Sequence, residues 1–137
     1  MDPFFAGYGS LVTMITALLL PPAASANTVL RCRVEQGGST RVLESTPTAD
    51  PYQVRAIDIN GRFRFKAVMV GDAAHIDYIK LYVYDQSARQ PRLLHEARYT
   101  TPLAATPATF QTGINYVYAP YLERELQYQC MLMELAP

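Results

Sequence analysis

Apolar and polar residues alternate along several stretches of this chain, which is the pattern of half-buried β-strands. In "IDYIKLYVYD" (residues 76–85), the aliphatic Ile79, Leu81 and Val83 alternate with tyrosines and a lysine. A polar loop, "QSARQP", separates this stretch from "RLLHEARYT", which we expect to be its hairpin partner. The aliphatic residues should face a core, with Tyr78, Tyr82 and Tyr84 on the opposite face.

The stretch "YQVRAIDINGRFRFKAVMV" (residues 52–70) predicts a β-hairpin with a two-residue type I′ turn at Asn60-Gly61, because both turn positions need a positive φ. That turn sets a register in which Arg55 lies opposite Lys66. The residues expected to face the core are Tyr52, Val54, Ala56 and Asp58, opposite Met69, Ala67, Phe65 and Phe63.

The two cysteines, Cys32 and Cys130, lie in two further alternating stretches, "TVLRCRVE" and "ERELQYQCML". In each stretch the cysteine and the apolar residues occupy every second position, which places them on the same face of the strand. Both cysteines should therefore point into the core. We expect a structural Cys32–Cys130 disulfide, because redox and metal-binding pairs need C-x-x-C spacing or histidine neighbours. A helix over residues 121–135 remains an alternative, since "YLERELQYQCMLMEL" is rich in good helix formers.

Seven or so short strands with turn signals between them predict an all-β fold, a single-domain antiparallel β-sandwich with one disulfide. An immunoglobulin-like sandwich and a small barrel are the alternative architectures. The Pro/Thr/Ala-rich stretch "TPLAATPATFQTG" (residues 101–113) is expected to be a long loop.

Residues 1–26 are expected to form a secretory signal peptide, and residues 27–137 the β-sandwich domain. An apolar run from Leu11 to Leu20 precedes Ala24 and Ala26, which fit an A-x-A cleavage site. Asp2 and the lack of Lys or Arg before the apolar run are atypical of a signal peptide. The run is nevertheless only half the roughly 20 residues that a membrane-spanning helix needs. We therefore expect an exported protein, periplasmic or secreted, with no membrane span after cleavage.

Net charge excludes few partners but argues against nucleic acid. The chain has 12 basic and 12 acidic residues, and removal of residues 1–26 takes away one acid, Asp2, which leaves a formal charge of +1. Stacked aromatic and basic side chains could bind nucleic acid, but a nearly neutral exported domain is a poor candidate.

Candidate catalytic or metal-binding residues are few. His75 lies in "GDAAHID" close to Asp72 and Asp77, a grouping that could bind a metal ion or act as a base. The second histidine, His95, is expected to be half-buried in a strand at a sheet edge, with Leu93 and Ala97 on its face. Motifs of serine hydrolases, zinc proteases and P-loop enzymes are absent from the sequence, so we expect neither an enzyme nor a cofactor.

Two sets of exposed side chains are candidates for binding. The first is basic and comes from the hairpin: Arg55, Arg62, Arg64 and Lys66. The second is aromatic: Tyr78, Tyr82, Tyr84, Tyr116 and Tyr118. Like charges directly opposed in a sheet are unfavourable, so the basic stripe needs acidic neighbours or an anionic partner. Tyrosine is favoured at protein interfaces, although outward tyrosines also stabilise strands by pairing across them.

The sequence therefore predicts an exported, non-enzymatic binding protein that recognises a protein or an anionic envelope component. One alternative is a small metal-binding protein or hydrolase centred on Asp72, His75 and Asp77. Another is a subunit of a surface assembly. The oligomeric state and the identity of the partner are left open by the sequence.

Overall fold

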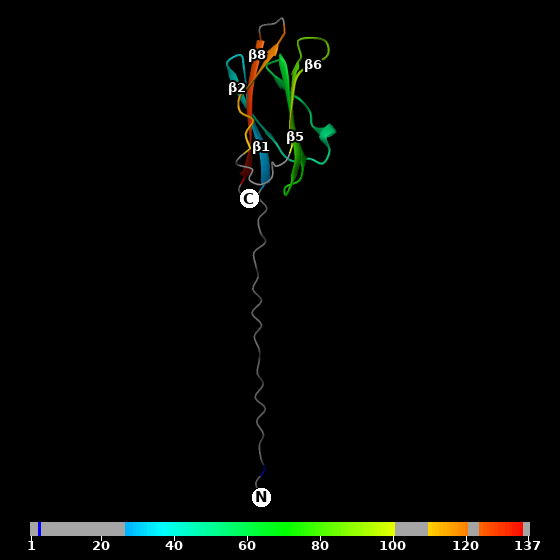
Figure 1. Ribbon diagram of the computed structural model, residues 1–137, viewed down its shortest axis with the longest axis vertical. Coiled ribbons are helices and arrows are strands. Elements are labelled where there is room, and N and C mark those ends of the chain that lie inside the picture. The colour runs from blue at the N-terminus through cyan, green and yellow to red at the C-terminus, as the bar shows by residue number, and fades with distance from the viewer. Residues whose placement is uncertain (1–2, 4–26, 101–109, 121–123, 136–137) are drawn as a thin grey trace.

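The computed structural model describes Pro3 and residues 27–100, 110–120 and 124–135, and it confirms the all-β sandwich-like fold. Two four-stranded antiparallel sheets pack against each other (Figure 1). The first sheet has the order β2-β1-β8-β7, with β1 Asn27–Gln36, β2 Ser39–Ser45, β7 Asn115–Ala119 and β8 Arg124–Leu135. The second has the order β3-β4-β5-β6, with β3 Ile57–Ile59, β4 Phe63–Gly71, β5 Ile76–Asp85 and β6 Arg92–Thr100. A short 3₁₀ helix, η1 (Pro51–Gln53), precedes β3.

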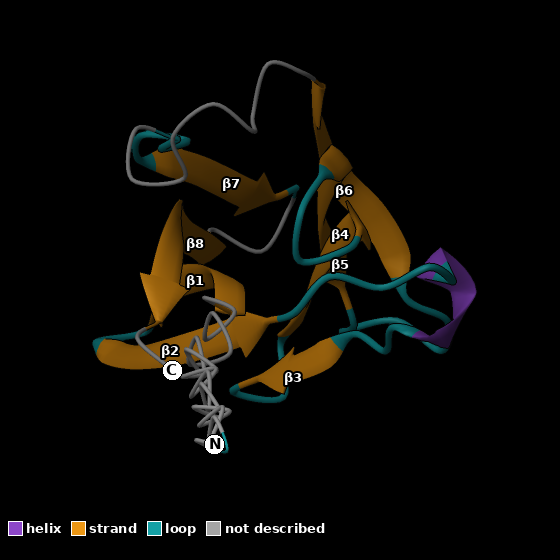
Figure 2. Cartoon of the chain, turned by 90° about the horizontal axis from the view of Figure 1, so that it is seen from below, coloured by secondary structure: helices purple, strands orange, loops and turns teal. Residues whose placement is uncertain are grey.

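All neighbouring strands are consecutive in the chain except β1 and β8, whose pairing joins the two ends of the domain. Figure 2 shows β2 beside β3 at one junction between the sheets, with β6 and β7 bordering the other. Within the described residues neither junction forms a ladder of paired strands, so the sheets are separate layers. No helix in this part of the chain has the length and apolar character needed to span a bilayer.

The core lies between the sheets and is built from the alternating residues that the sequence predicted. Ile79, Leu81 and Val83 on β5 are fully buried, while Leu30 on β1 and Leu126 on β8 close the core from the other sheet. The predicted β5–β6 hairpin is confirmed by an antiparallel ladder. The structure also excludes the alternative of a helix near the end of the described chain, because residues 124–135 form a strand.

The Cys32–Cys130 disulfide is confirmed, and it joins directly opposed residues of adjacent strands. Cys130 directs its backbone away from β1: its N–H donates to Thr112 Oγ1 at 2.9 Å, and its carbonyl accepts from Thr112 N–H at 3.0 Å. The two cysteines are thus a non-hydrogen-bonded pair, the type in which opposed Cα atoms come closest. Their Cα atoms are 4.1 Å apart. The disulfide therefore links the first and last strands within one sheet.

The Asn60-Gly61 turn forms, but the predicted hairpin register is wrong by one residue. Asn60 and Gly61 have φ values of 55° and 69°, and Arg62 N–H donates to Ile59 O at 3.1 Å, yet the ladder pairs Ile59 with Phe63. This register buries Ile59 beside Phe63 and leaves Asp58 on the outer face. Burial of an aliphatic side chain is favourable, whereas burial of a carboxylate is unfavourable. This difference explains why the strands pair in the register that buries Ile59 and exposes Asp58.

The corrected register changes two expectations. Arg55 does not lie opposite Lys66, because β3 contains only Ile57–Ile59, and Asp58 is instead opposite Arg64. The expected like-charge pair across the strands is therefore wrong. Tyr52 does not face the core opposite Met69 either: it lies on η1, where its side chain is 93% exposed.

A second difference from the sequence prediction is a bulge in β6. Val83 pairs with His95 and Tyr84 with Leu93, so Leu94 is an extra residue in the ladder. Because of this extra residue, Leu93 turns to the outer face, where it is 51% exposed, and does not share a face with His95 as expected. His95 is half-buried in the edge strand, as predicted.

The turn between β4 and β5 requires glycine at position 71. Gly71 has a φ of 146°, and a Cβ atom there would collide with the backbone oxygen of His75. We expect Gly71→Ala to lower the free energy of unfolding by about 3 kcal/mol, because backbone strain and a steric clash act together. Gly113→Ala is the control, since Gly113 has a φ of 70° with open space around it and should show strain alone. Equal losses in urea unfolding would mean that the His75 carbonyl moves aside.

Candidate binding face

The outer face of the β3-β4-β5-β6 sheet combines most of the basic and aromatic side chains that the sequence singled out. Arg64 lies opposite Tyr84 and Lys66 opposite Tyr82 in the β4–β5 ladder, while Tyr78 lies opposite Val70. Members of both candidate sets, the basic and the aromatic, thus share one surface. We call this surface the Tyr/Lys face; its residues are Arg64, Lys66, Val68, Tyr78, Lys80, Tyr82, Tyr84, Glu96 and Arg98.

Cations lie over the tyrosine rings on the Tyr/Lys face. The Nζ atoms of Lys66 and Lys80 are 5.6 and 5.7 Å from the centroid of the Tyr82 ring, and Arg98 Cζ is 4.7 Å from that of Tyr78. The Tyr82 and Tyr84 rings stack with centroids 6.2 Å apart. Such cation–π contacts hold long basic side chains against the sheet and keep their charged groups close to the rings.

The charges on this face are only partly balanced. Lys80 Nζ lies 2.9 Å from Glu96 Oε1, and this contact, together with the Tyr82 hydroxyl, raises the pKa of Lys80. Arg64 Nε donates to Gln86 Oε1 at 2.8 Å. Lys66, in contrast, forms no ion pair with any described carboxylate. The face therefore presents an ammonium group that the described part of the protein does not neutralise.

Asp58 contributes to this face indirectly, by holding Gln86. The Gln86 amide donates to Asp58 Oδ1, and Gly61 N–H donates to Asp58 Oδ2 at 3.0 Å. These two hydrogen bonds, the one from Gln86 first, lower the pKa of the Asp58 carboxyl. Since Gln86 also accepts from Arg64, the network fixes the position of that guanidinium.

A shallow hollow of about 140 Å³ lies where η1 meets the Tyr/Lys face. Its lining residues are Pro51, Tyr52, Lys66, Val68, Tyr78, Lys80 and Tyr82. Asp50 caps η1, because its Oδ1 accepts from Tyr52 N–H at 2.9 Å. Thr48 fastens the preceding segment to β4 by backbone hydrogen bonds to Met69 and Gly71. The hollow thus combines aromatic rings with two ammonium groups.

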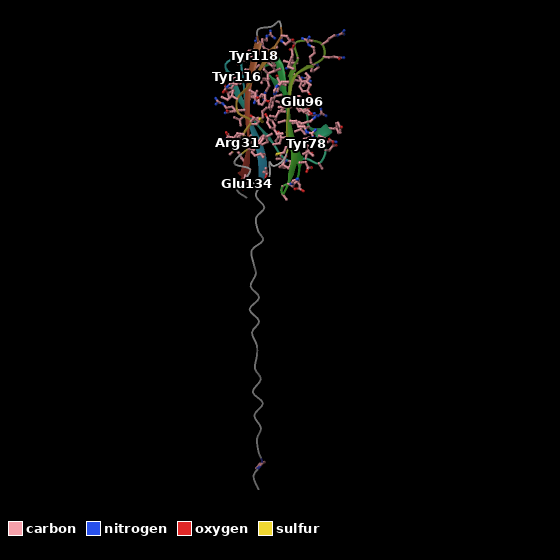
Figure 3. All side chains as sticks on the ribbon, viewed as in Figure 1. Arg31, Tyr78, Glu96, Tyr116, Tyr118 and Glu134 are labelled. Carbon is pink, nitrogen blue, oxygen red and sulfur yellow. A yellow bond between two sulfur atoms is a disulfide. The ribbon has the colours of Figure 1, made fainter. Side chains whose placement is uncertain are left out.

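The remaining candidate binding residues lie elsewhere. Tyr116 and Tyr118 belong to β7 and lie on the outer face of the other sheet, on the opposite side of the sandwich from Tyr78 and Glu96 (Figure 3). A hydrogen bond with Glu125 raises the pKa of Tyr118. Arg62 is exposed at the β3–β4 turn, and Arg55 is exposed in the segment between η1 and β3. The structure therefore does not gather all nine predicted residues into one site.

Asp72, His75 and Asp77 do not converge on a metal site. Asp72 Oδ1 accepts from the backbone N–H groups of Ala74 and His75, both at 2.8 Å, which lowers the pKa of Asp72 and shapes the turn. His75 Nε2 lies 3.2 Å from Asp77 Oδ1 on an exposed surface. Among the described residues, no three His, Cys, Asp or Glu side chains form a group that could hold a metal ion.

Sequence reasoning missed a polar contact between the two sheets. His95 Nε2 lies 2.7 Å from the hydroxyl of Tyr128, a fully buried residue of β8. Burial raises the pKa of Tyr128 far above its usual value, so the phenol stays protonated. The alternation of "LQYQCMLMEL" placed Tyr128 inside but gave no signal for its partner on β6.

The pH dependence of stability should report on His95. Burial lowers the pKa of His95 below its ordinary value of 6.5, so the unfolded chain takes up a proton at a higher pH than the folded protein. The contribution of His95 to the unfolding free energy should therefore be constant well above pH 6.5 and should decrease as the pH falls below 6.5. In urea unfolding, His95→Gln should flatten this decline, whereas His75→Gln, on an exposed loop, is the control. An unchanged slope in His95→Gln would assign the decline to other groups.

Among the residues of this region that were absent from the predicted set are Tyr52, Lys80 and Arg98. Lys80 shares the parity of Tyr78 and Tyr82, so the alternation already placed it beside them. The place of Arg98 on this face depends on the β5–β6 register, and Tyr52 was wrongly assigned to the core because the predicted hairpin register was wrong.

Comparison of the chain with protein-family models, curated proteins and solved structures gives no match.

Proposed function

We propose that this protein is an exported, non-enzymatic binding protein and that its Tyr/Lys face recognises an anionic partner. The supporting observation is the position of Lys66. Its ammonium group lies over the same tyrosine ring as that of Lys80, but only Lys80 has a carboxylate partner among the described residues. Like charges on neighbouring positions of a sheet repel, and an anionic group bound between the two lysines would relieve that repulsion.

The aromatic residues suit the same role. Tyr52, Tyr78 and Tyr82 line the hollow beside the two lysines. Tyrosine provides a large contact area at a low cost in conformational entropy, and its hydroxyl group stays hydrogen-bonded in a wet interface. A face that only stabilises the sheet would need tyrosines that pair with residues of the adjacent strand but would have no use for Tyr52, which lies on η1 and is 93% exposed.

Export is the part of the proposal that concerns location. The Cys32–Cys130 disulfide is compatible with an oxidising compartment such as the periplasm or the cell exterior. The sequence pattern of residues 1–26 points to the same destination.

Charge reversal at Lys66 tests the proposal. Wild type, Lys66→Glu and Arg33→Glu would be compared for binding to heparin, to vesicles containing phosphatidylglycerol and to neutral phosphatidylcholine vesicles. Arg33 is the matched control, because it lies on the outer face of the other sheet and the change in net charge is the same. We expect Lys66→Glu to weaken binding to an anionic probe at least tenfold, about 1.4 kcal/mol, and Arg33→Glu to have a much smaller effect.

Salt dependence separates a local site from general attraction. Binding through the Tyr/Lys face should weaken with increasing salt, and less steeply in Lys66→Glu than in wild type. Equal losses in both variants would indicate attraction by net charge alone and would contradict the proposal. The same holds if wild type binds neither anionic probe at low salt.

A further inference from the structure

A second cavity, separate from the Tyr/Lys face, lies at the junction between β2 and β4. It has a volume of about 270 Å³. The cavity exists because β3 pairs only with Phe63–Phe65, so β4 has no strand neighbour on that side beyond Phe65. Further along, an isolated bridge between Thr48 and Val70 closes the junction. Between these points the two sheets form no ladder, and a hydrogen bond from Ser45 Oγ on β2 to Ala67 O on β4, at 3.4 Å, links them.

The inner wall of this cavity is apolar. Leu43 comes from β2, Ile57 from β3, and Phe65 and Ala67 from β4. Phe65 is 1% exposed, and its ring packs against Tyr128 with centroids 5.3 Å apart. Phe65 therefore forms the buried base of this wall, and the more exposed Leu43 and Ile57 offer apolar surface to a hydrocarbon or aromatic group.

The rim of the cavity is polar, and its two charged residues are Arg55 and Glu44. Arg55 and Thr46 line it from the connection between β2 and β3. Arg55 makes no ion pair with a described carboxylate. Among the lining residues only Glu44 is acidic, and its Oε1 accepts two hydrogen bonds from Arg31, at 2.8 and 2.6 Å. Glu44 is thus neutralised from the outer face of the first sheet, whereas Arg55 is available to a ligand.

We infer that this cavity binds a small monocarboxylate, with its aromatic or short alkyl body against the wall that includes Leu43 and Ile57 and its carboxylate on Arg55. The guanidinium fork matches a carboxylate with two parallel hydrogen bonds. Ligand pockets usually have volumes of about 300 Å³ or more, so a cavity just below that size takes a compact ligand and not a long lipid chain. The inference is independent of the Tyr/Lys face, because the cavity and the hollow share no lining residue.

Titration with 3-phenylpropionate and with hexanoate tests the site directly. Backbone amide NMR shifts should change at Leu43, Ile57, Phe65 and Ala67, and calorimetry should give the affinity. The matched neutral ligand is 3-phenylpropanamide, which has nearly the same shape but no charge. We expect the amide to bind at least tenfold more weakly than the acid. The inference is wrong if 3-phenylpropionate and 3-phenylpropanamide bind equally. It is also wrong if neither ligand, at 20-fold molar excess, changes the backbone NMR shifts of these four residues.

Two variants assign the contacts. Arg55→Gln should weaken binding of the acid at least tenfold, while Arg62→Gln, which removes an exposed arginine from the nearby turn, should leave it unchanged. Ala67→Leu should fill the cavity and abolish binding, with its fold checked by circular dichroism. If Ala67→Leu fails to fold, Arg55→Gln alone decides, because Arg55 is exposed and its replacement does not disturb the core.

The two proposed sites can be told apart. Lys66→Glu should leave carboxylate binding in the cavity unchanged, and Arg55→Gln should leave heparin binding unchanged. Loss of both activities in either variant would overturn the assignment of the carboxylate to a separate site.

Discussion

Removal of the Cys32–Cys130 cross-link is expected to lower the free energy of unfolding by about 4 kcal/mol. The bond closes a loop with a sequence separation of 98 residues. In the chain-entropy model, such a long loop greatly restricts the unfolded state, and small domains have total stabilities of only about 5–15 kcal/mol. The double variant Cys32→Ala/Cys130→Ala should therefore be close to unfolding at 37 °C.

Two measurements separate the cross-link from the packing of the sulfur atoms. Urea unfolding of the reduced wild type removes the covalent bond but keeps both side chains, whereas the alanine double variant also leaves cavities beside the core. Both cysteines are almost completely buried, at 1% and 2% exposure, so reduction should require unfolding. A loss of less than about 1 kcal/mol in the reduced wild type would show that the β1–β8 ladder needs no cross-link.

The strands and the disulfide could be predicted because both depend on the alternation of buried and exposed positions along a strand. A residue in a strand points to one face or the other, and alternation along the sequence records which face is buried. Ile79, Leu81 and Val83 were therefore placed correctly, and so were Cys32 and Cys130. Parity also opposed a helix over residues 124–135, which the structure describes as a strand.

The register of β3 and the adjacency of β4 and β5 could not be predicted in the same way. The Asn60-Gly61 signal specifies the turn but not the residue at which pairing starts, and a shift of one residue exchanges the two faces of β3. The energetic preference for burying Ile59 over Asp58 decided the register. An extra residue in β6 likewise reversed the face of Leu93, and nothing in the local sequence marks that bulge.

The Tyr/Lys face shows how much depends on adjacency. Alternation predicts the face on which Lys66 lies in one strand and Tyr82 in another, but it does not indicate that β4 and β5 are neighbours. Once they pair, Lys66 lies opposite Tyr82. Two members of the basic set and three of the aromatic set then form a single surface, on which the proposed function depends.

Tyr128 should be one of the most sensitive positions in the core. Its side chain is fully buried, packs against the ring of Phe65 and hydrogen-bonds to His95 on the other sheet. We expect Tyr128→Ala to lower the free energy of unfolding by about 4 kcal/mol, because it removes a large aromatic group and leaves a cavity between the sheets. Tyr128→Phe keeps the ring and removes only the hydroxyl, so it should cost about 1 kcal/mol.

The comparison of these two variants measures how the sheets are held together. If apolar packing dominates, most of the loss in Tyr128→Ala is absent from Tyr128→Phe. A double-mutant cycle of Tyr128→Phe with His95→Ala should then give a coupling energy of only about 1 kcal/mol. If Tyr128→Phe were as destabilising as Tyr128→Ala, the hydrogen bond to His95 would be the main link between the sheets. In that case the decline in stability at low pH, attributed to His95, should also change strongly in Tyr128→Phe, which the same urea unfolding series would reveal.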